Sequence, residues 1–255
     1  METKKQKLYV ILCGIFLTNA ITAEIIGAKI FSLSESLGLN IQGFSFLGMD
    51  MGFALTAGTL SWPFVFIISD VINEYFGKKG VKFISYLTAA LITFAFMVIY
   101  LAVHVKPAAF WLEVNSTDSQ GNPININEGF KMIFRQGMGI ILGSISAFLI
   151  GQVLDAVVFH RLRKLTSNKM IWLRATGSTV VSQFIDSFVV IFIAFYLFGN
   201  WSLTQVTTVG TNNYLYKFVV AIVLTPLVYI AHYLIDRWLG EEHSKDLIDK
   251  ATATD

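Results

Sequence analysis

The segment WLRATGSTVVSQFIDSFVVIFIAF, residues 172–195, places polar side chains in a stretch that ends strongly apolar. On a helix that advances about 100° per residue, several small polar residues share one face with a carboxylate. These residues are Ser178, Thr179, Ser182 and Asp186, with Gln183 at the edge of the face. Hydroxyls alone would serve helix packing in a membrane, but an intramembrane carboxylate is costly and is by default a hypothesis of function. For Asp186 we therefore predict a functional role, with a structural ion pair or a neutral acid as the alternatives.

A second polar group lies in SWPFVFIISDVINEYFGKK, residues 61–79. Asp70, Asn73 and Glu74 are spaced i, i+3 and i+4, so they share one face of a helix. Gly77 is followed by two lysines, a pattern typical of a helix end. A solvated helix end is therefore the alternative role for Glu74, whereas Asp70 lies deeper in the apolar run.

A third polar group lies in GQVLDAVVFHRLRK, where Gln152 and Asp155 are about one helical turn apart. Asp155 would line the same interior as the other carboxylates, or pair with Arg161 or Arg163. Glu24, in TNAITAEIIGAK, lies well inside an apolar run and cannot easily reach water. Together these groups predict a polar cavity suited to a flat, hydrogen-bonding organic molecule, because an ion channel would more typically show a carbonyl filter or a ring of like charges.

The elements that must position these residues are membrane helices. The 255 residues are 55% hydrophobic and 14% charged, with a mean hydropathy of +0.63, whereas soluble domains are about 25% charged. Segments of roughly 20 apolar residues can span a bilayer. Six such segments are predicted, at about 8–30, 53–73, 82–104, 137–159, 179–199 and 216–238. We therefore expect an all-α, polytopic six-helix bundle.

The chain is expected to form one transmembrane domain over residues 1–240, followed by a polar cytoplasmic tail, 241–255, that frays. Pro63, roughly ten residues into the second predicted helix, is expected to kink it. Cytoplasmic loops carry an excess of lysine and arginine. Placing both termini in the cytoplasm puts fourteen of the nineteen lysines and arginines on that side. The net charge of +2 then reflects membrane orientation rather than nucleic-acid binding, and 105–136 and 200–215 become outer loops.

The motifs SWPFVFIISDVINEYFGKK, GQVLDAVVFHRLRK and STVVSQFIDSFVVIFIAF, in this order and each on a predicted helix, resemble the queuosine precursor transporter family. Members are six-helix proteins of the bacterial inner membrane, once described as vitamin uptake transporters. The resemblance implies import of 7-cyano or 7-aminomethyl 7-deazaguanines, precursors of a modified tRNA base, without direct contact with nucleic acid. The chain departs from the family pattern at Glu24, where asparagine is expected, and at Ala175, where a more polar residue is expected.

A deazaguanine presents two adjacent donors, N1–H and the exocyclic amine, which one carboxylate can accept side by side. Asp186 is the first choice for that carboxylate, followed by Glu24 or Asp155. The carbonyl at position 6 needs a donor, and the flat ring can stack on aromatic side chains. The remaining predicted binding residues are Gln183, Gln152 and Asn73 as donors, Ser182 on the polar face, and Trp62 and Tyr75 as stacking partners.

Other classes of protein fit the sequence less well. An intramembrane enzyme needs a nucleophile beside a base, but the histidines are scattered, and none is placed for a haem or quinone site. We therefore predict no catalytic residue, no metal site and no cofactor. The substrate-binding subunit of a vitamin importer driven by a separate ATPase stays open as an alternative, as do a homo-oligomer and the choice between proton-coupled and facilitated transport.

Overall fold

The computed structural model describes residues 4–27, 29–38, 44–46, 49–51, 54–138, 141–166, 170–197 and 201–253, and these are mostly helical. The long elements are α1 (Lys4–Ile26), α3 (Trp62–His104), α6 (Ile141–Leu165), α7 (Ile171–Ile191) and α8 (Leu203–Leu239). The shorter helices are α2 (Leu33–Ser36), η1 (Ala57–Leu60), α4 (Ala109–Val114), α5 (Ile126–Met138), the π-helical η2 (Phe192–Leu197) and α9 (Glu241–Ala253). The strands are β1 (Ile30–Ser32), β2 (Phe44–Phe46), β3 (Met49–Met51) and β4 (Ala54–Thr56), which form the antiparallel pairs β1–β4 and β2–β3.

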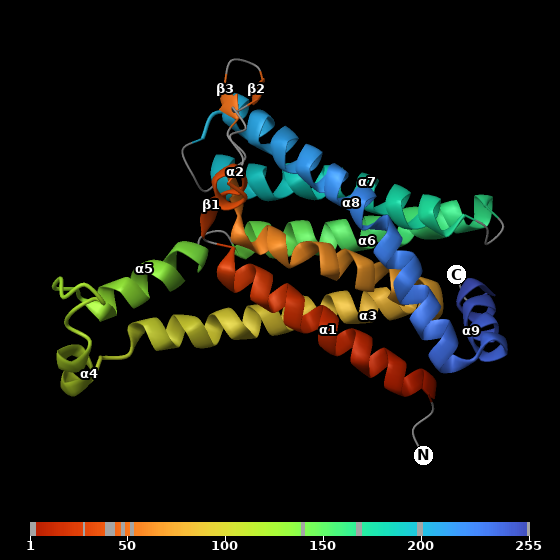
Figure 1. Ribbon diagram of the computed structural model, residues 1–255, viewed down its shortest axis with the longest axis horizontal. Coiled ribbons are helices and arrows are strands. Elements are labelled where there is room, and N and C mark those ends of the chain that lie inside the picture. Colours follow the sequence, from red (N-terminus) through yellow and green to blue (C-terminus); the bar gives the residue numbers. More distant parts are fainter. Residues whose placement is uncertain are drawn as a thin grey trace.

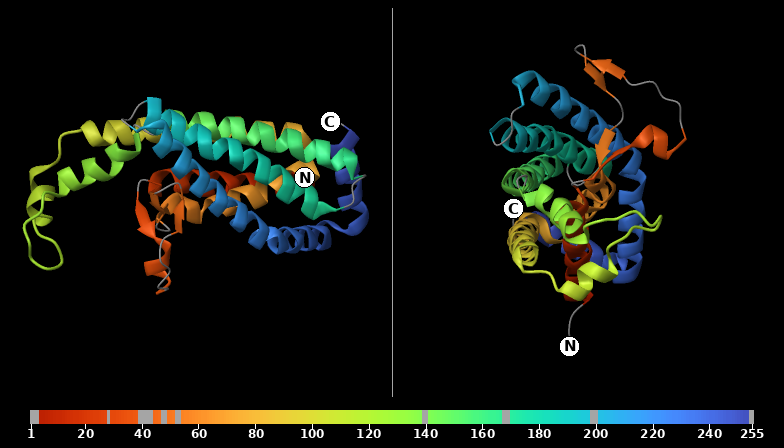
Figure 2. Two further views of the ribbon diagram at one scale, coloured as in Figure 1. Left: turned by 90° about the horizontal axis from the view of Figure 1, so that it is seen from above. Right: turned by 90° about the vertical axis from the view of Figure 1, so that its left-hand side faces the viewer.

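The long helices lie lengthwise in one bundle, with α4 and α5 standing out at one end and α9 at the other (Figure 1). The view from above shows the same separation of the two ends (Figure 2). The start of α1 lies toward the α9 end, where Lys4 Nζ donates to the carbonyl oxygen of Trp238 at 2.9 Å. Both ends of the described chain are therefore on the same side of the bundle.

Four helices among the described residues are long and apolar enough to cross a membrane. These spans are Lys4–Ile26, Trp62–His104, Gly143–Leu165 and Asn213–Leu239, and Val180–Ile191 of α7 is a shorter apolar stretch. Helix α8 in particular exposes large apolar side chains such as Val219, Val223 and Ile230 along its outer face. Lipid can cover such a surface, whereas soluble monomers rarely expose extended apolar patches. The prediction of an all-α membrane protein is confirmed.

Helix α3 reverses direction at Gly77, whose φ of 67° and ψ of −173° are not helical. Glycine adopts positive φ at little cost because it has no Cβ. The orange and yellow halves of α3 run in opposite directions (Figure 1). A straight helix of 43 residues would be about 65 Å long, roughly twice the 30 Å hydrocarbon core of a bilayer. The reversal instead folds this apolar segment into a helical hairpin.

Several predicted boundaries were wrong. The second predicted helix begins at Trp62 rather than near residue 53, because 54–56 form strand β4 and 57–60 form η1. Pro63 consequently lies in the first turn of α3, where its missing N–H is not needed. The expected kink at Pro63 is therefore not a feature of the structure.

The two segments predicted as outer loops are more helical than expected. Residues 105–136 contain α4 and most of α5, and α8 starts at Leu203, well before residue 216. A capping box explains this early start, because the Ser202 side chain accepts from the N–H of Gln205 while the Gln205 side chain accepts from the N–H of Ser202.

Residues 241–253 of the predicted polar tail form helix α9. Helix α9 buries Leu247 and Ala251, which are four residues apart on one face. It follows Gly240, whose φ of 92° ends α8, and its apolar face contributes to the cluster built from α1 and α3. The last described helix therefore closes one end of the bundle.

Candidate functional site

Polar side chains from α3, α6 and α7 meet inside the bundle and are each at most 4% exposed. We call this set the polar core. It consists of Ser69, Asp70 and Asn73 on α3, Gln152 and Asp155 on α6, and Ser178, Ser182, Gln183 and Ser187 on α7. The helical spacing predicted a shared face for Asp70 and Asn73, for Gln152 and Asp155, and for Ser178 and Ser182, with Gln183 at its edge. The structure brings these faces together, and Ser69 and Ser187 were not predicted.

Asp155 is held by donors from the two neighbouring helices. Asn73 Nδ2 donates to its Oδ2 at 3.3 Å, and Ser182 Oγ donates to its Oδ1 at 3.4 Å. Ser178 also hydrogen-bonds to this side chain. These donors compensate part of the cost of removing a carboxylate from water. Ser69 Oγ donates to Gln152 Oε1 at 3.0 Å. This second contact between α3 and α6 lies about one helical turn from the contact between Asn73 and Asp155.

Other atoms of the polar core have no hydrogen-bond partner among the described residues. They are Asp70 Oδ1, Asn73 Oδ1, Gln183 Oε1 and Ser187 Oγ. A buried polar group left unsatisfied costs about 1–3 kcal/mol, so native structures rarely keep several together without a reason. Three of the four atoms are carbonyl or carboxylate oxygens, which can only accept. The polar core is therefore suited to a ligand that presents several N–H donors.

A buried ion pair lies at the end of the polar core nearer α9. Arg163 Nη2 is 3.5 Å from Glu74 Oε1. The same guanidinium donates to the backbone carbonyls of Asn73, Glu74 and Ile248. A helix leaves its last carbonyls without intrahelical partners, and Asn73 and Glu74 lie in the last turn before the break at Gly77. Glu74 is thus buried rather than at a solvated helix end, and Arg163 pairs with it.

A second charged group lies toward the other end of the bundle and joins four helices. We call Glu24, Ser144, Asp186 and Lys217 the charged cluster. Lys217 Nζ is 2.5 Å from Asp186 Oδ2, and Ser144 Oγ donates to Glu24 Oε1 at 2.5 Å. Glu24 also interacts electrostatically with Asp186 and Lys217. The proposed substrate carboxylate Asp186 is therefore already bound to a lysine, which was one of the alternatives for it.

Lys217 was missed in the sequence, although a lysine inside an apolar segment is itself a signal of function. The charged cluster adjoins the polar core. Asp186 of the charged cluster packs against Gly151, where an added Cβ would lie 3.6 Å from the Asp186 Cβ. Gly151 is the residue before Gln152 of the polar core. The side chains of Thr179 and Ala175 lie outside the described part of the chain.

The two predicted stacking residues have other neighbours. Trp62 lies in the first turn of α3, with its ring centroid 5.7 Å from that of Phe148 and 5.8 Å from that of Phe66. The buried Tyr75 donates its hydroxyl to Asp236 Oδ1 at 2.6 Å and lies 3.1 Å from His232 Nδ1. Tyr75 therefore links α3 to α8, and stacking on a substrate stays a prediction for both residues.

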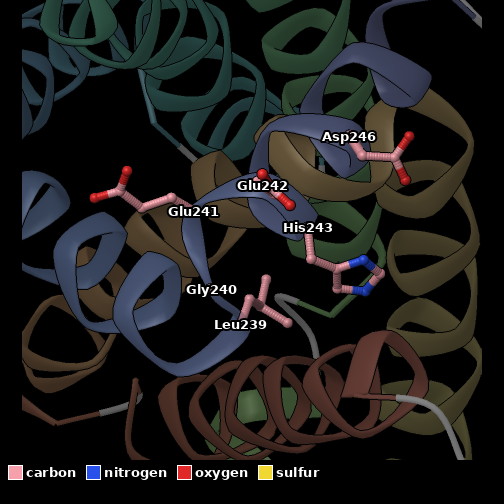
Figure 3. Close-up of a pocket in the computed structure, with 6 residues that line it drawn as sticks. All are labelled: Leu239, Gly240, Glu241, Glu242, His243 and Asp246. Atoms are coloured by element: carbon pink, nitrogen blue, oxygen red, sulfur yellow. The ribbon is translucent and has the colours of Figure 1, made fainter.

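A surface pocket lies at the turn between α8 and α9 (Figure 3), and its lining includes none of the polar core residues. Its lining residues are Leu239, Gly240, Glu241, Glu242, His243 and Asp246. The carboxylates of Glu241 and Asp246 point in different directions in Figure 3. Ligand sites usually show a few polar groups that converge on one point, so we place the candidate site at the polar core instead.

Apolar outer faces around buried polar and charged side chains define a polytopic helical membrane protein. A family model described as "Putative vitamin uptake transporter" matches residues 56–231, and the chain belongs to this family. All three motifs that suggested the queuosine precursor transporters lie within the matched range, and that resemblance is confirmed. Glu24 lies outside the matched range.

Three relatives carry transporter names. "Probable queuosine precursor transporter" of Bacillus subtilis (strain 168) is 29% identical over 185 residues, covering 72% of this chain and 74% of the relative. A protein of the same name from Haemophilus influenzae is 29% identical over 177 residues, covering 69% of this chain and 67% of the relative. "Queuosine precursor transporter" of Escherichia coli (strain K12) is 31% identical over 147 residues, covering 57% of this chain and 58% of the relative. No solved structure matches the chain. The relatives support a transporter role.

Proposed function

We propose that this protein imports queuosine precursors, 7-cyano-7-deazaguanine or 7-aminomethyl-7-deazaguanine, across the bacterial inner membrane for use in tRNA modification. The names of the three relatives support the substrate class. The observation that carries the proposal is a set of buried acceptors in the polar core that have no hydrogen-bond partner among the described residues: Asp70 Oδ1, Asn73 Oδ1 and Gln183 Oε1. A deazaguanine supplies N1–H and amine donors for acceptors of this kind.

Within the polar core, we assign the donor edge of the base to Asp70 rather than to Asp186. Asp155 is already held by Asn73 and Ser182, and Asp186 by Lys217. Within the described part of the chain, Asp70 Oδ1 accepts no hydrogen bond, and Gln183 and Asn73 add further acceptors. Paired donors from the base onto one carboxylate are charge-assisted, and such hydrogen bonds are roughly twice as strong as neutral ones.

Binding requires the helices around the polar core to separate. Its side chains are almost completely buried between α3, α6 and α7. A substrate therefore reaches them only when the bundle opens to one side, as alternating access around a central site requires. The unpaired acceptors destabilise the closed, empty arrangement and are satisfied when the base is bound.

The proposed topology has six crossings, made by α1, the two halves of α3, α6, α7 and α8, with both termini in the cytoplasm. The reversal of α3 at Gly77 and the position of α9 beside the start of α1 support this arrangement. At that same end, Lys78 and Lys79 follow the break in α3 at Gly77, and Arg161 and Lys164 lie in the last five residues of α6. Their position there agrees with the excess of positive charge in cytoplasmic loops.

Uptake of labelled 7-cyano-7-deazaguanine by the purified protein in liposomes tests the function. We expect saturable uptake that unlabelled 7-aminomethyl-7-deazaguanine competes and that needs no nucleotide. Uptake that appears only when an ATPase complex and ATP are added would support the alternative, a binding subunit of an ATP-driven importer. The absence of both binding and uptake for either base would contradict the proposed substrate class.

A further inference from the structure

The charged cluster contains two carboxylates but one lysine. Lys217 on α8 pairs with Asp186 on α7, and Glu24 on α1 interacts with both. Ser144 on α6 donates to Glu24. A separate electrostatic group links Asp70, Asp155 and Glu74, and Arg163 is the partner of Glu74. The charged cluster is thus a distinct unit built from four helices, with Glu24 as its second acid.

Counting charges shows that the charged cluster cannot be neutral when all three groups are ionised. Glu24 and Asp186 would then carry two negative charges against the single positive charge of Lys217. An uncompensated charge inside a membrane is costly, and a single added proton removes it. A hydroxyl both donates and accepts, so Ser144 can hydrogen-bond to either form of Glu24.

The location of the charged cluster suits a proton that enters from outside. Glu24 is two residues from the end of α1, and Ser144 is three residues from the start of α6, both at the end away from α9. In the proposed topology this is the outer half of the bundle. The polar core, with Asp155 and Asn73, lies further along α6 toward the cytoplasmic end.

The geometry points to a proton-binding site at Glu24, shared electrostatically with Asp186 and Lys217, that couples substrate import to the proton gradient. This inference rests on the proposed transport function. A proton from the outer water forms an O–H bond at the Glu24 carboxylate. Asp186 is then the one charged carboxylate in the charged cluster that pairs with Lys217. When the bundle opens inward, that O–H bond breaks and the proton enters the cytoplasmic water. Lys217 is then shared by two carboxylates, so α1, α7 and α8 adopt different arrangements in the two states.

Proteoliposomes containing the full-length protein test the coupling, with 7-cyano-7-deazaguanine as the probe and the membrane potential held at zero. One pH unit, acid outside, allows about tenfold accumulation of a neutral substrate that moves with one proton. For the wild type we expect uptake of the probe against its concentration gradient. We also expect the lumen to become more acidic when substrate is added, as reported by a pH-sensitive dye inside the liposomes. For Glu24→Gln, which keeps the size and a hydrogen bond to Ser144, we expect accumulation to fall to equilibrium while exchange of internal for external substrate continues.

The matched control is Glu128→Gln, because Glu128 forms an exposed ion pair with Lys131 at 2.8 Å. This variant should accumulate substrate as the wild type does. Net substrate uptake by the wild type without acidification of the lumen, or gradient-driven accumulation by Glu24→Gln, would overturn the coupling site and leave the transport function intact. Wild-type protein that neither binds nor exchanges the probe would contradict the proposed function itself. The wild-type dye signal still tests proton coupling if Glu24→Gln does not fold.

Discussion

The guanidinium of Arg163 lies 3.5 Å from the Glu74 carboxylate, and both side chains are only 1% exposed. The same guanidinium donates to the carbonyl of Ile248 in α9 at 3.3 Å. One side chain of α6 therefore joins the end of the first half of α3 to the last helix. Since α9 covers this contact, the predicted cytoplasmic end of the bundle is closed in this structure.

Removal of Arg163 should strongly destabilise the protein, because Arg163→Met leaves Glu74 buried without this charge partner. The expected loss is about 3–5 kcal/mol of unfolding free energy, measured by thermal unfolding in detergent. The double variant Arg163→Met, Glu74→Met should recover part of the loss, because no buried charge is then left behind. Lys131→Met, which breaks the exposed pair with Glu128, should cost less than about 1 kcal/mol. A double variant less stable than Arg163→Met would rule out this account.

The proposed topology predicts which side of the membrane each loop occupies. A cysteine at the exposed Ser119, between α4 and α5, should react with a membrane-impermeant maleimide added to intact cells. A cysteine at the exposed Glu242, at the start of α9, should react only after the cells are opened. Both are introduced into a Cys13→Ser background, since Cys13 is the single native cysteine. The reverse labelling pattern would invert the orientation and the proposed path of the proton.

Tyr75→Phe tests whether the Tyr75 hydroxyl has a structural role. Tyr75→Phe removes the donor to Asp236 Oδ1, which also accepts from Ser244 of α9. The lost hydrogen bond should cost about 1–2 kcal/mol of stability, while the retained ring would preserve any stacking. We therefore expect a lower unfolding temperature and an unchanged dissociation constant for the deazaguanine. Ser244→Ala is the comparison, since it removes the other donor to Asp236 and leaves the Tyr75 ring in place.

Helical periodicity was sufficient to predict contacts that depend on one face of one helix. Ser178 and Ser182 were assigned to a common face, and both hydrogen-bond to Asp155. The membrane class also followed from composition alone. Contacts that need the relative position of two helices were not predictable in this way, so Lys217 was missed although it pairs with Asp186.

Two local errors have a similar cause. The apolar residues Leu247 and Ala251 are spaced as one helix face, but the charged residues around them made the tail look solvated. Their burial depends on the surface of α3 and its neighbours, which a single segment does not reveal. A kink was likewise expected at Pro63 because hydropathy alone placed the start of the helix near residue 53. In the structure β4 and η1 occupy residues 54–60, and α3 begins at Trp62.

Asp70 gives the sharpest test of the substrate site. Its buried Oδ1 atom has no hydrogen-bond partner in the parts of the chain that the structure describes, and we expect it to accept hydrogen bonds from the base. Asp70→Asn keeps the shape but places an amide where the ligand donates, so binding should weaken by at least about tenfold, at 1.4 kcal/mol per decade. The measurement is the dissociation constant of 7-cyano-7-deazaguanine for purified protein. Asp249→Asn, at an exposed carboxylate on α9, should leave this constant unchanged.

A comparison between two ligands shows which edge of the base Asp70 reads. An analogue without the exocyclic amine should bind wild type and Asp70→Asn with more similar affinities, because it lacks one of the paired donors. Asp186→Asn should affect both ligands alike, since Asp186 is held by Lys217 at 2.5 Å. If Asp186→Asn instead discriminates between the ligands and Asp70→Asn does not, the donor edge is read at the charged cluster. The substrate and the proton would then compete for one group of carboxylates rather than occupy two.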